Sequence, residues 1–227
     1  MKAIYTTILL FAAFSTSLLA QETRQLEAFT ALEVGDAYEV ILQKGSTHEA
    51  RIEGDGEELE RLQIETKGNT LVIERDGYSW RQRSSGRVTI YLTYTSLDEI
   101  EVSGASTLSA KETLNAKSLQ LEVSGASTVT LQVDLNRLNA EVSGASTVRL
   151  SGTAQEHWID VNGASTYSAG DLKATAVDIE ASGASSAKVW AEEKIDARSY
   201  GASSVRYGGN PTNVDSDTSG AGSVKKM

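Results

Sequence analysis

The sequence has no cysteine, and this absence excludes disulfide bonds, thiolate metal sites and cysteine catalysis. Histidine occurs only twice, as His48 and His157, which leaves too few nitrogen ligands for a zinc site. The single proline, Pro211, argues against a collagen-like chain and against a proline-rich linker. We therefore predict no resident cofactor, and packing alone must stabilise the fold.

Cations are outnumbered, since 21 Lys and Arg residues stand against 31 Asp and Glu residues, for a net charge of −10. A nucleic-acid binder needs clustered cations to neutralise phosphates, so this balance predicts no nucleic-acid partner. After the first twenty residues, no stretch is apolar enough to cross a bilayer, which predicts no transmembrane span. With 40% hydrophobic residues, the 227-residue chain can still build a core.

Residues 1–20 have the order of features found in a secretory signal peptide. Lys2 precedes a short apolar run, and small and polar residues lead to Ala20, after which we predict cleavage. A membrane anchor is the alternative, but Ser15 to Ser17 interrupt the run before it reaches the roughly 20 residues of a span. We expect an exported protein of the periplasm, the outer surface or the extracellular space.

A five-residue motif of the form [SNY]GA[SG][ST] recurs seven times between residues 98 and 227, at intervals of 18 to 21 residues. Its glycines are Gly104, Gly125, Gly144, Gly163, Gly183, Gly201 and Gly220. Before each glycine, apolar and polar residues alternate with period two, as on a strand with one buried face. The period is too short for a helical repeat or a whole propeller blade. We predict an all-β fold, a single-stranded parallel β-solenoid with about 19–20 residues per coil and glycine at each corner.

Residues 21–97 lack the strict repeat but contain strand-like segments. Residues 32–42 resemble a degenerate copy of the repeat, and Lys67-Gly68-Asn69 predicts a hairpin turn. Glu57 to Arg61 is long enough for one helical turn, and Gly77 to Gly86 is typical of an exposed loop. We interpret this region as an N-terminal β cap with the first degenerate coils; a separate β domain is the alternative.

Acidic residues stand three positions before most of the repeat glycines. They are Glu101, Glu122, Glu141, Asp160, Glu180 and Asp217, with Arg198 at the remaining copy. Stacked coils would align them in one outward column, which we call the acidic stripe. A solvated face that blocks aggregation is the simplest interpretation, and weak calcium or cationic-ligand binding is the sharper one.

The motif serines are six near-equivalent copies, so they are expected to be structural and not nucleophiles, and no second glycine completes a nucleophile elbow. Three positions after the glycines runs a column of hydroxyl residues that could bind ice or sugar. The next outward column mixes Ser and Thr with Arg and Lys, which disfavours an ice-binding face.

Three features together resemble the head GIN domain family, whose members are labelled auto-transporter adhesins. These are the opening phrase of residues 29–42, the phrase of residues 87–105 that leads into the first motif, and the recurring SGAS corners. The resemblance covers about residues 29–224 and implies an exported β-solenoid without assigned catalytic residues. We therefore expect a secreted, non-catalytic binding or structural module of the cell envelope, an adhesin that contacts a glycan or an envelope protein. A polysaccharide lyase or hydrolase on a β-helix is the alternative, and a passive envelope spacer is the third possibility.

Overall fold

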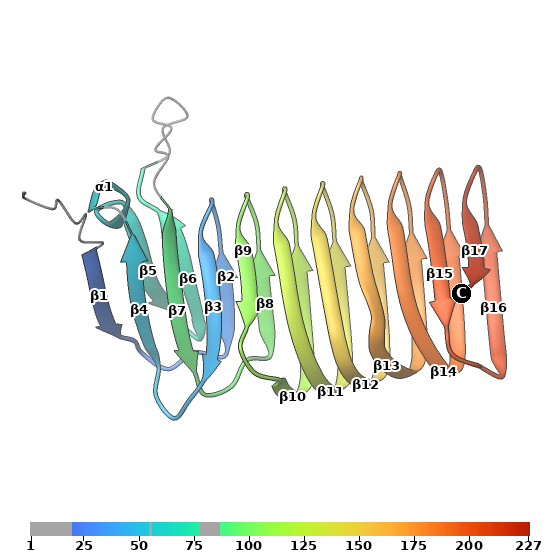
Figure 1. Cartoon of the computed structure of the whole chain (residues 1–227), viewed down its shortest axis with the longest axis horizontal. Helices are drawn as coiled ribbons and strands as arrows, with labels where there is room; N and C mark the ends of the chain where they lie inside the picture. The colour runs from blue at the N-terminus through green and yellow to red at the C-terminus, as the bar shows by residue number, and fades with distance from the viewer. Residues whose placement is uncertain (1–19, 55, 78–86) are drawn as a thin grey trace, which may run out of the picture.

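The computed structural model describes residues 20–54, 56–77 and 87–227, and shows a parallel β-solenoid of about seven turns (Figure 1). The predicted all-β fold class is confirmed. The predicted signal peptide and the loop of residues 78–86 lie outside the described residues, so neither interpretation is tested. The first strand begins at Ala20, at the predicted cleavage site.

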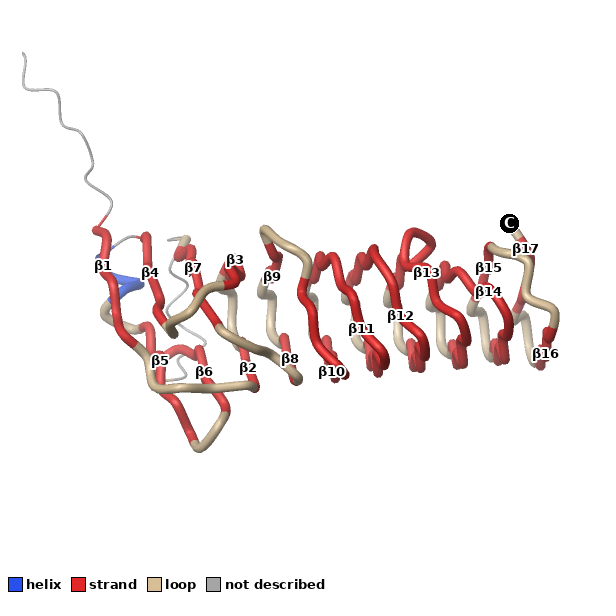
Figure 2. Tube along the Cα trace, turned by 90° about the horizontal axis from the view of Figure 1, so that it is seen from below, coloured by secondary structure: helices blue, strands red, loops and turns tan. Residues whose placement is uncertain are grey.

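The repeat region winds through ten strands stacked in parallel. Their bounds are β8 (Glu99–Val102), β9 (Thr107–Ala110), β10 (Leu114–Val123), β11 (Thr128–Val142), β12 (Thr147–Val161), β13 (Thr166–Ala181), β14 (Ser186–Ser199), β15 (Ser204–Gly208), β16 (Asn213–Thr218) and β17 (Ser223–Lys226). Each coil runs away from a Gly-Ala-Ser corner, bends, and returns to the next corner, so the solenoid has two faces. The front face holds the segments that follow the corners, and the back face holds the segments that lead into them (Figures 1 and 2).

One detail differs from the expected strand, corner and short second strand. In the middle coils the strand continues through the bend opposite the corner, so β11 to β14 are 14 to 16 residues long. The hydrogen-bond register of β11 and β12 passes the bend with only one residue pair skipped. The bend therefore needs no turn residues, which explains why no second motif marks it in the sequence.

Alternating residues of both faces fill the interior. In β11, Val129, Leu131 and Val133 point inward from the front face, and Leu138 and Val142 do so from the back face. Every one of these side chains is almost fully buried, and its neighbour one coil later stands at the equivalent position of that coil. A single coil could not bury this apolar surface alone, so the stack is the unit of stability.

The N-terminal region folds as a small mixed sheet at one end of the rod. Its elements are β1 (Ala20–Gln25), β2 (Ala31–Val34), β3 (Glu39–Lys44), β4 (Glu49–Gly54), α1 (Gly56–Leu59), β5 (Leu62–Lys67), β6 (Thr70–Arg75) and β7 (Val88–Tyr94). The predicted hairpin at Gly68 joins β5 and β6, which pair antiparallel, and α1 supplies the single helical turn.

The degenerate copy in residues 32–42 is a true coil, because β2 pairs in parallel with β8 and β3 with β9. Asp36 takes the place of the corner glycine and has a positive φ of 63°. The order of stacking is not sequential, however. β6 and β7 pair with the outer edges of β2 and β3, so later residues cover the first coil and close the end of the core.

Candidate functional site

The Gly-Ala-Ser corners stack in a column whose residues are structural and not catalytic. The seven motif glycines have φ values of 71° to 74°, in the left-handed region that favours glycine. The serine two residues after each of the first six glycines is buried, and several of these hydroxyls donate to a carbonyl one coil earlier, as Ser203 does to Ala181 at 2.9 Å. Buried hydroxyls with backbone partners are structural residues, which agrees with the reasoning from their six-fold repetition.

The pairing register places all members of the acidic stripe in one outward column on the back face. Glu101 faces Glu122, and the column continues through Glu141 and Asp160 to Glu180. Arg198 and then Asp217 complete it at the far end. The register also adds Glu33 of the degenerate coil, beside Glu101, which the motif spacing did not reveal.

Burial raises the pKa of Glu101, and the neighbouring carboxylates of Glu33, Glu122 and Glu99 raise it further. A raised pKa in the folded state means that stability falls as the pH rises through that pKa and the group ionises. We predict that Glu101→Gln stabilises the protein at pH 7 by about 0.5 kcal/mol after allowance for solvent screening.

Denaturant unfolding at low salt and at pH 7 measures this effect. The gain should shrink at high salt and disappear below pH 4, where the wild-type carboxyl is protonated too. Glu27→Gln, at an exposed position outside the ion pairs of the described residues, is the control and should change little. A variant less stable than wild type at pH 7 would show that Glu101 has a favourable partner instead.

Within the described ranges, no group of three or more His, Asp or Glu side chains is arranged to hold a metal ion. The stripe spaces its carboxylates along the rod and does not converge them on one point. Weak calcium binding along the stripe therefore stays a prediction, and a calcium titration monitored by the melting temperature tests it.

A hollow of about 210 Å³ lies on the back face beside an exposed tryptophan. It is framed by two outward columns on three adjacent coils: Glu156, Ala176 and Lys194 in one, and Trp158, Asp178 and Asp196 in the other. Ala176 is the floor, because its short side chain stands between the long side chains of Glu156 and Lys194. Trp158 is 40% exposed and forms one wall. We call this feature the Trp158 hollow.

Ion pairs hold the carboxylates of the Trp158 hollow in place. The guanidinium of Arg198 lies 3.2 Å from an oxygen of Asp178 and 2.9 Å from one of Asp196, so it bridges two coils. Arg137 lies 2.7 Å from Glu156. Lys194 takes part in none of the ion pairs of the described residues, so its ammonium can donate to a ligand. The result is an aromatic wall with fixed acceptors and one donor.

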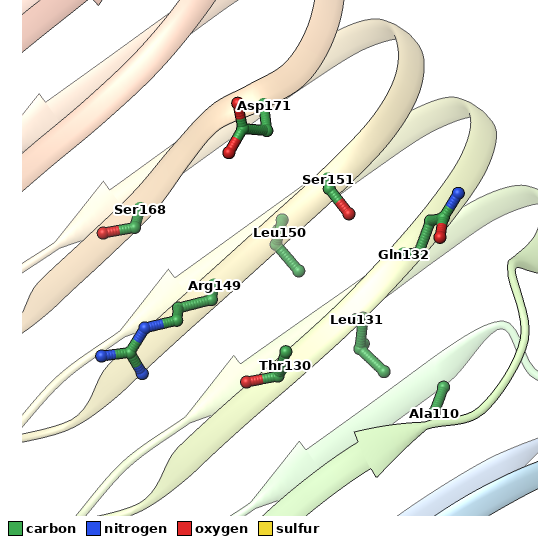
Figure 3. A pocket seen from close by; sticks show the side chains of 9 residues that line it. All are labelled: Ala110, Thr130, Leu131, Gln132, Arg149, Leu150, Ser151, Ser168 and Asp171. Atoms are coloured by element: carbon green, nitrogen blue, oxygen red, sulfur yellow. The ribbon is translucent and has the colours of Figure 1, made fainter.

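A second hollow of about 360 Å³ lies on the front face (Figure 3). Thr130, Arg149 and Ser168 form one outward column along it, and Gln132, Ser151 and Asp171 lie beside them. A bulge in β13, where Arg149 pairs with Ser168 but Ser151 pairs with Asp171, displaces one wall. This hollow has no aromatic side chain among its lining residues, so its hydroxyl, amide and charged groups offer hydrogen bonds without a stacking surface.

The Trp158 hollow was not predicted from the sequence, although one of its residues stands out there. Trp158 stands five residues before Gly163, in an outward column whose other members are polar or acidic. A large aromatic residue in a solvated column is a sign of a binding surface. The hollow itself arises from a small residue between large ones on neighbouring coils, which needs the pairing register. His157, by contrast, is buried in the core.

Fold and surface together define this protein as a parallel β-solenoid that presents two long, mostly polar faces. The chain belongs to the family described as "Putative auto-transporter adhesin, head GIN domain", whose model matches residues 28–211. The resemblance inferred from the motifs is therefore confirmed. A search of curated proteins finds no match.

Solved structures share the fold over nearly their whole length. One from Bacteroides fragilis, described as a "putative adhesin", is 24% identical with a TM-score of 0.85 and covers 93% of this chain and 98% of its own. Another "putative adhesin", from Parabacteroides merdae, is 20% identical with a TM-score of 0.70 and covers 93% of this chain and 97% of its own. A "putative lipid binding protein" from Parabacteroides distasonis is 18% identical with a TM-score of 0.70, covering 91% and 96%. At these identities the likeness shows the fold alone. No helix of the described chain has the length and apolar character needed to span a membrane.

Proposed function

We propose that this protein is an exported, non-catalytic adhesive module that binds a glycan at the Trp158 hollow. The observation that carries the proposal is an indole exposed on a flat sheet beside fixed carboxylates and a free ammonium. An aromatic face packs against the apolar face of a sugar ring, while charged and amide groups around it bond to the hydroxyls. The family and its adhesin relatives support a binding role.

The charges around the hollow favour a particular kind of glycan. Glu156, Asp178 and Asp196 line it, and Asp160 of the acidic stripe lies on the same strand as Trp158. Arg137, Arg198 and Lys194 offset the carboxylates of the hollow itself, but the neighbouring acidic stripe and the net charge of −10 repel a uronate or sulfated sugar, so neutral or amino sugars fit best.

One relative is described as a "putative lipid binding protein", so a lipid is the alternative to a glycan as the ligand. The exposed side chains of this chain favour one of the two. Among the described residues, the large exposed hydrophobic side chains are Trp158, Val214 and Met227. Three aspartates, Asp178, Asp196 and Asp215, follow Trp158 in its outward column and separate it from the coil of Val214, so no broad apolar surface forms around it to receive an acyl chain. A single aromatic residue among polar groups suits a sugar better than a lipid.

Affinity electrophoresis in gels containing neutral, amino and acidic polysaccharides tests the proposal. We expect retardation by a neutral or amino polymer, and Trp158→Ala should weaken the affinity ~10-fold because one stacked ring contributes about 1.4 kcal/mol. Trp158→Phe should keep much of the binding. Tyr91→Ala, which removes an aromatic ring from the front face, is the control and should bind like wild type.

Three outcomes would contradict the proposal. No retardation by any polymer would remove the glycan, and capture of an envelope protein instead would identify the other class of partner. Release of reducing ends or unsaturated products from the polymer would indicate the enzyme alternative.

A further inference from the structure

The last coil of the solenoid is more exposed than the middle coils of the described chain. All six residues of β16 are exposed, although the equivalent segments of β11 to β14 bury every second side chain. Val214 is 46% exposed at a position where the preceding coil buries Ile195 completely. The N-terminal end of the core is therefore covered by the mixed sheet that begins at β6 and β7, whereas the C-terminal end is left uncovered at β16 and β17 (Figure 1).

Both strands of this coil present one unpaired edge within the described structure. β16 pairs with β14, and β17 pairs with β15, and neither has a second partner. Unpaired edges are templates for another strand. The two edges carry opposite charges: β16 has Asp215 and Asp217 facing outward, and β17 has Lys225 in the outward column of Arg206.

We propose that this end is an interface with a second copy of the chain, formed by antiparallel pairing of β16 with the partner's β17. Two copies meeting end to end can be related by a two-fold axis along the strands or by one perpendicular to the sheets. The first axis exchanges the front and back faces. Because β16 runs toward the corner and β17 runs away from it, this axis brings β16 and the partner's β17 together antiparallel, twice and identically.

The second axis is disfavoured on two grounds. It would pair β16 with its own copy and β17 with its own copy, so Asp would face Asp and Lys would face Lys. It would also need both edges at one height, whereas the chain climbs along the rod from β16 to β17. The first axis tolerates this difference in position along the rod, because both strand pairs are then the same contact, between β16 of one copy and β17 of the other.

Few registers are possible for the proposed strand pairing. Outward residues must face outward residues, so Lys225 of the partner lies opposite Asp215 or Asp217. In the register that places Lys225 opposite Asp215, the partner's inward Val224 lies opposite Ser216 and diagonally across from Val214, so these side chains cover the open end of each core. Edge-strand addition of this kind gives main-chain hydrogen bonds for affinity and side-chain pairs for specificity.

The arrangement has a consequence for adhesion. Because the axis exchanges the faces, the two Trp158 hollows of a dimer point in opposite directions. A dimer could then hold two surfaces or two polymer chains together, as a bridging protein must. The interface stands on its own observations, so it survives if the hollow binds no glycan.

Light scattering after gel filtration tests the interface with charge-reversed chains. At about 100 µM we expect wild type to elute with twice the mass of one chain, and to dissociate at lower concentration and in high salt. Asp215→Lys with Asp217→Lys places like charges in both strand pairs and should weaken the dimer at least ~10-fold, as should Lys225→Glu alone. These residues are exposed in the single chain, so the melting temperature of the monomer should change little.

Mixing the two monomeric variants gives the sharpest result. In the mixed pair, one strand contact has Lys facing Glu and the other keeps the wild-type Asp and Lys, so a heterodimer should form. Glu141→Lys in the middle of the back face is the control and should dimerise like wild type. A monomeric wild type, a dimer unaffected by both reversals, or a mixture that stays monomeric would each overturn the proposal.

Discussion

Gly144→Ala should destabilise the protein by about 2–5 kcal/mol, one of the largest effects expected from adding a single methyl group. Gly144 has φ = 74°, where any Cβ is strained. A Cβ built there would also lie 2.4 Å from the carbonyl oxygen of Gly125 and 3.0 Å from its nitrogen, one coil below. Both atoms belong to backbone, so neither can move aside without separating two coils.

Gly68 provides a matched control for this substitution. It has nearly the same dihedral angle, φ = 68°, but its Cβ would meet nothing within 4 Å. Gly68→Ala therefore carries only the conformational strain, about 1–2 kcal/mol. The shift in urea midpoint should be clearly larger for Gly144→Ala. Equal shifts would show that the corners are not stacked in contact, and that glycine is needed there for its conformation only.

Replacing the buried pair of His157 and Tyr167 should remove a large pH dependence of stability. Nε2 of His157 lies 2.6 Å from the hydroxyl of Tyr167, and both side chains are fully enclosed. Burial lowers the pKa of His157 to about 3 from its ordinary 6.5. As the pH falls through 6.5, the unfolded chain therefore takes up a proton that the folded chain refuses, and stability is lost, by up to about 5 kcal/mol near pH 3.

The double variant His157→Leu, Tyr167→Phe tests this effect. Leu is the residue at the same position in the preceding coil, Leu138, so the core should accept it. At pH 7.5 the double variant should lie within about 1.5 kcal/mol of wild type, because both polar partners are removed together. Between pH 7.5 and pH 4.5, the free energy of unfolding of wild type should fall by about 2.7 kcal/mol more than that of the double variant. The reason is that only wild type loses two pH units of proton linkage below pH 6.5.

Urea unfolding at several pH values gives the comparison. The single variant Tyr167→Phe keeps a buried His157 and should retain the wild-type slope, which makes it the control. Identical slopes for all three proteins would mean that His157 accepts a proton in the folded state, and that the core around it opens to water.

The repeat could be predicted from sequence because one coil dictates the next. A glycine every 18 to 21 residues fixes the corners, and the alternation before it, as in Leu138, Ala140 and Val142, fixes which face is inside. Once the coils are stacked, the acidic stripe follows from spacing alone. These features share one cause, which is that equivalent residues must lie over one another.

The N-terminal order could not be predicted in this way. Residues 31–44 form a coil, but the strands that cover it, β6 and β7, come later in the chain and obey no period. Their partners are set by which apolar faces remain open, which depends on the assembled structure. The Trp158 hollow was missed for a similar reason. It needs Ala176 to lie between Glu156 and Lys194, and these three residues are neighbours only through the pairing of separate coils.

The most direct test of the binding role is a crystal structure of the protein with the polysaccharide fragment that it retains best. We predict a sugar ring lying over the exposed face of Trp158, with hydroxyls bonded to Asp178 or Asp196 and to Lys194. A fragment bound elsewhere, for example in the front hollow beside Arg149, would contradict the assignment of the site.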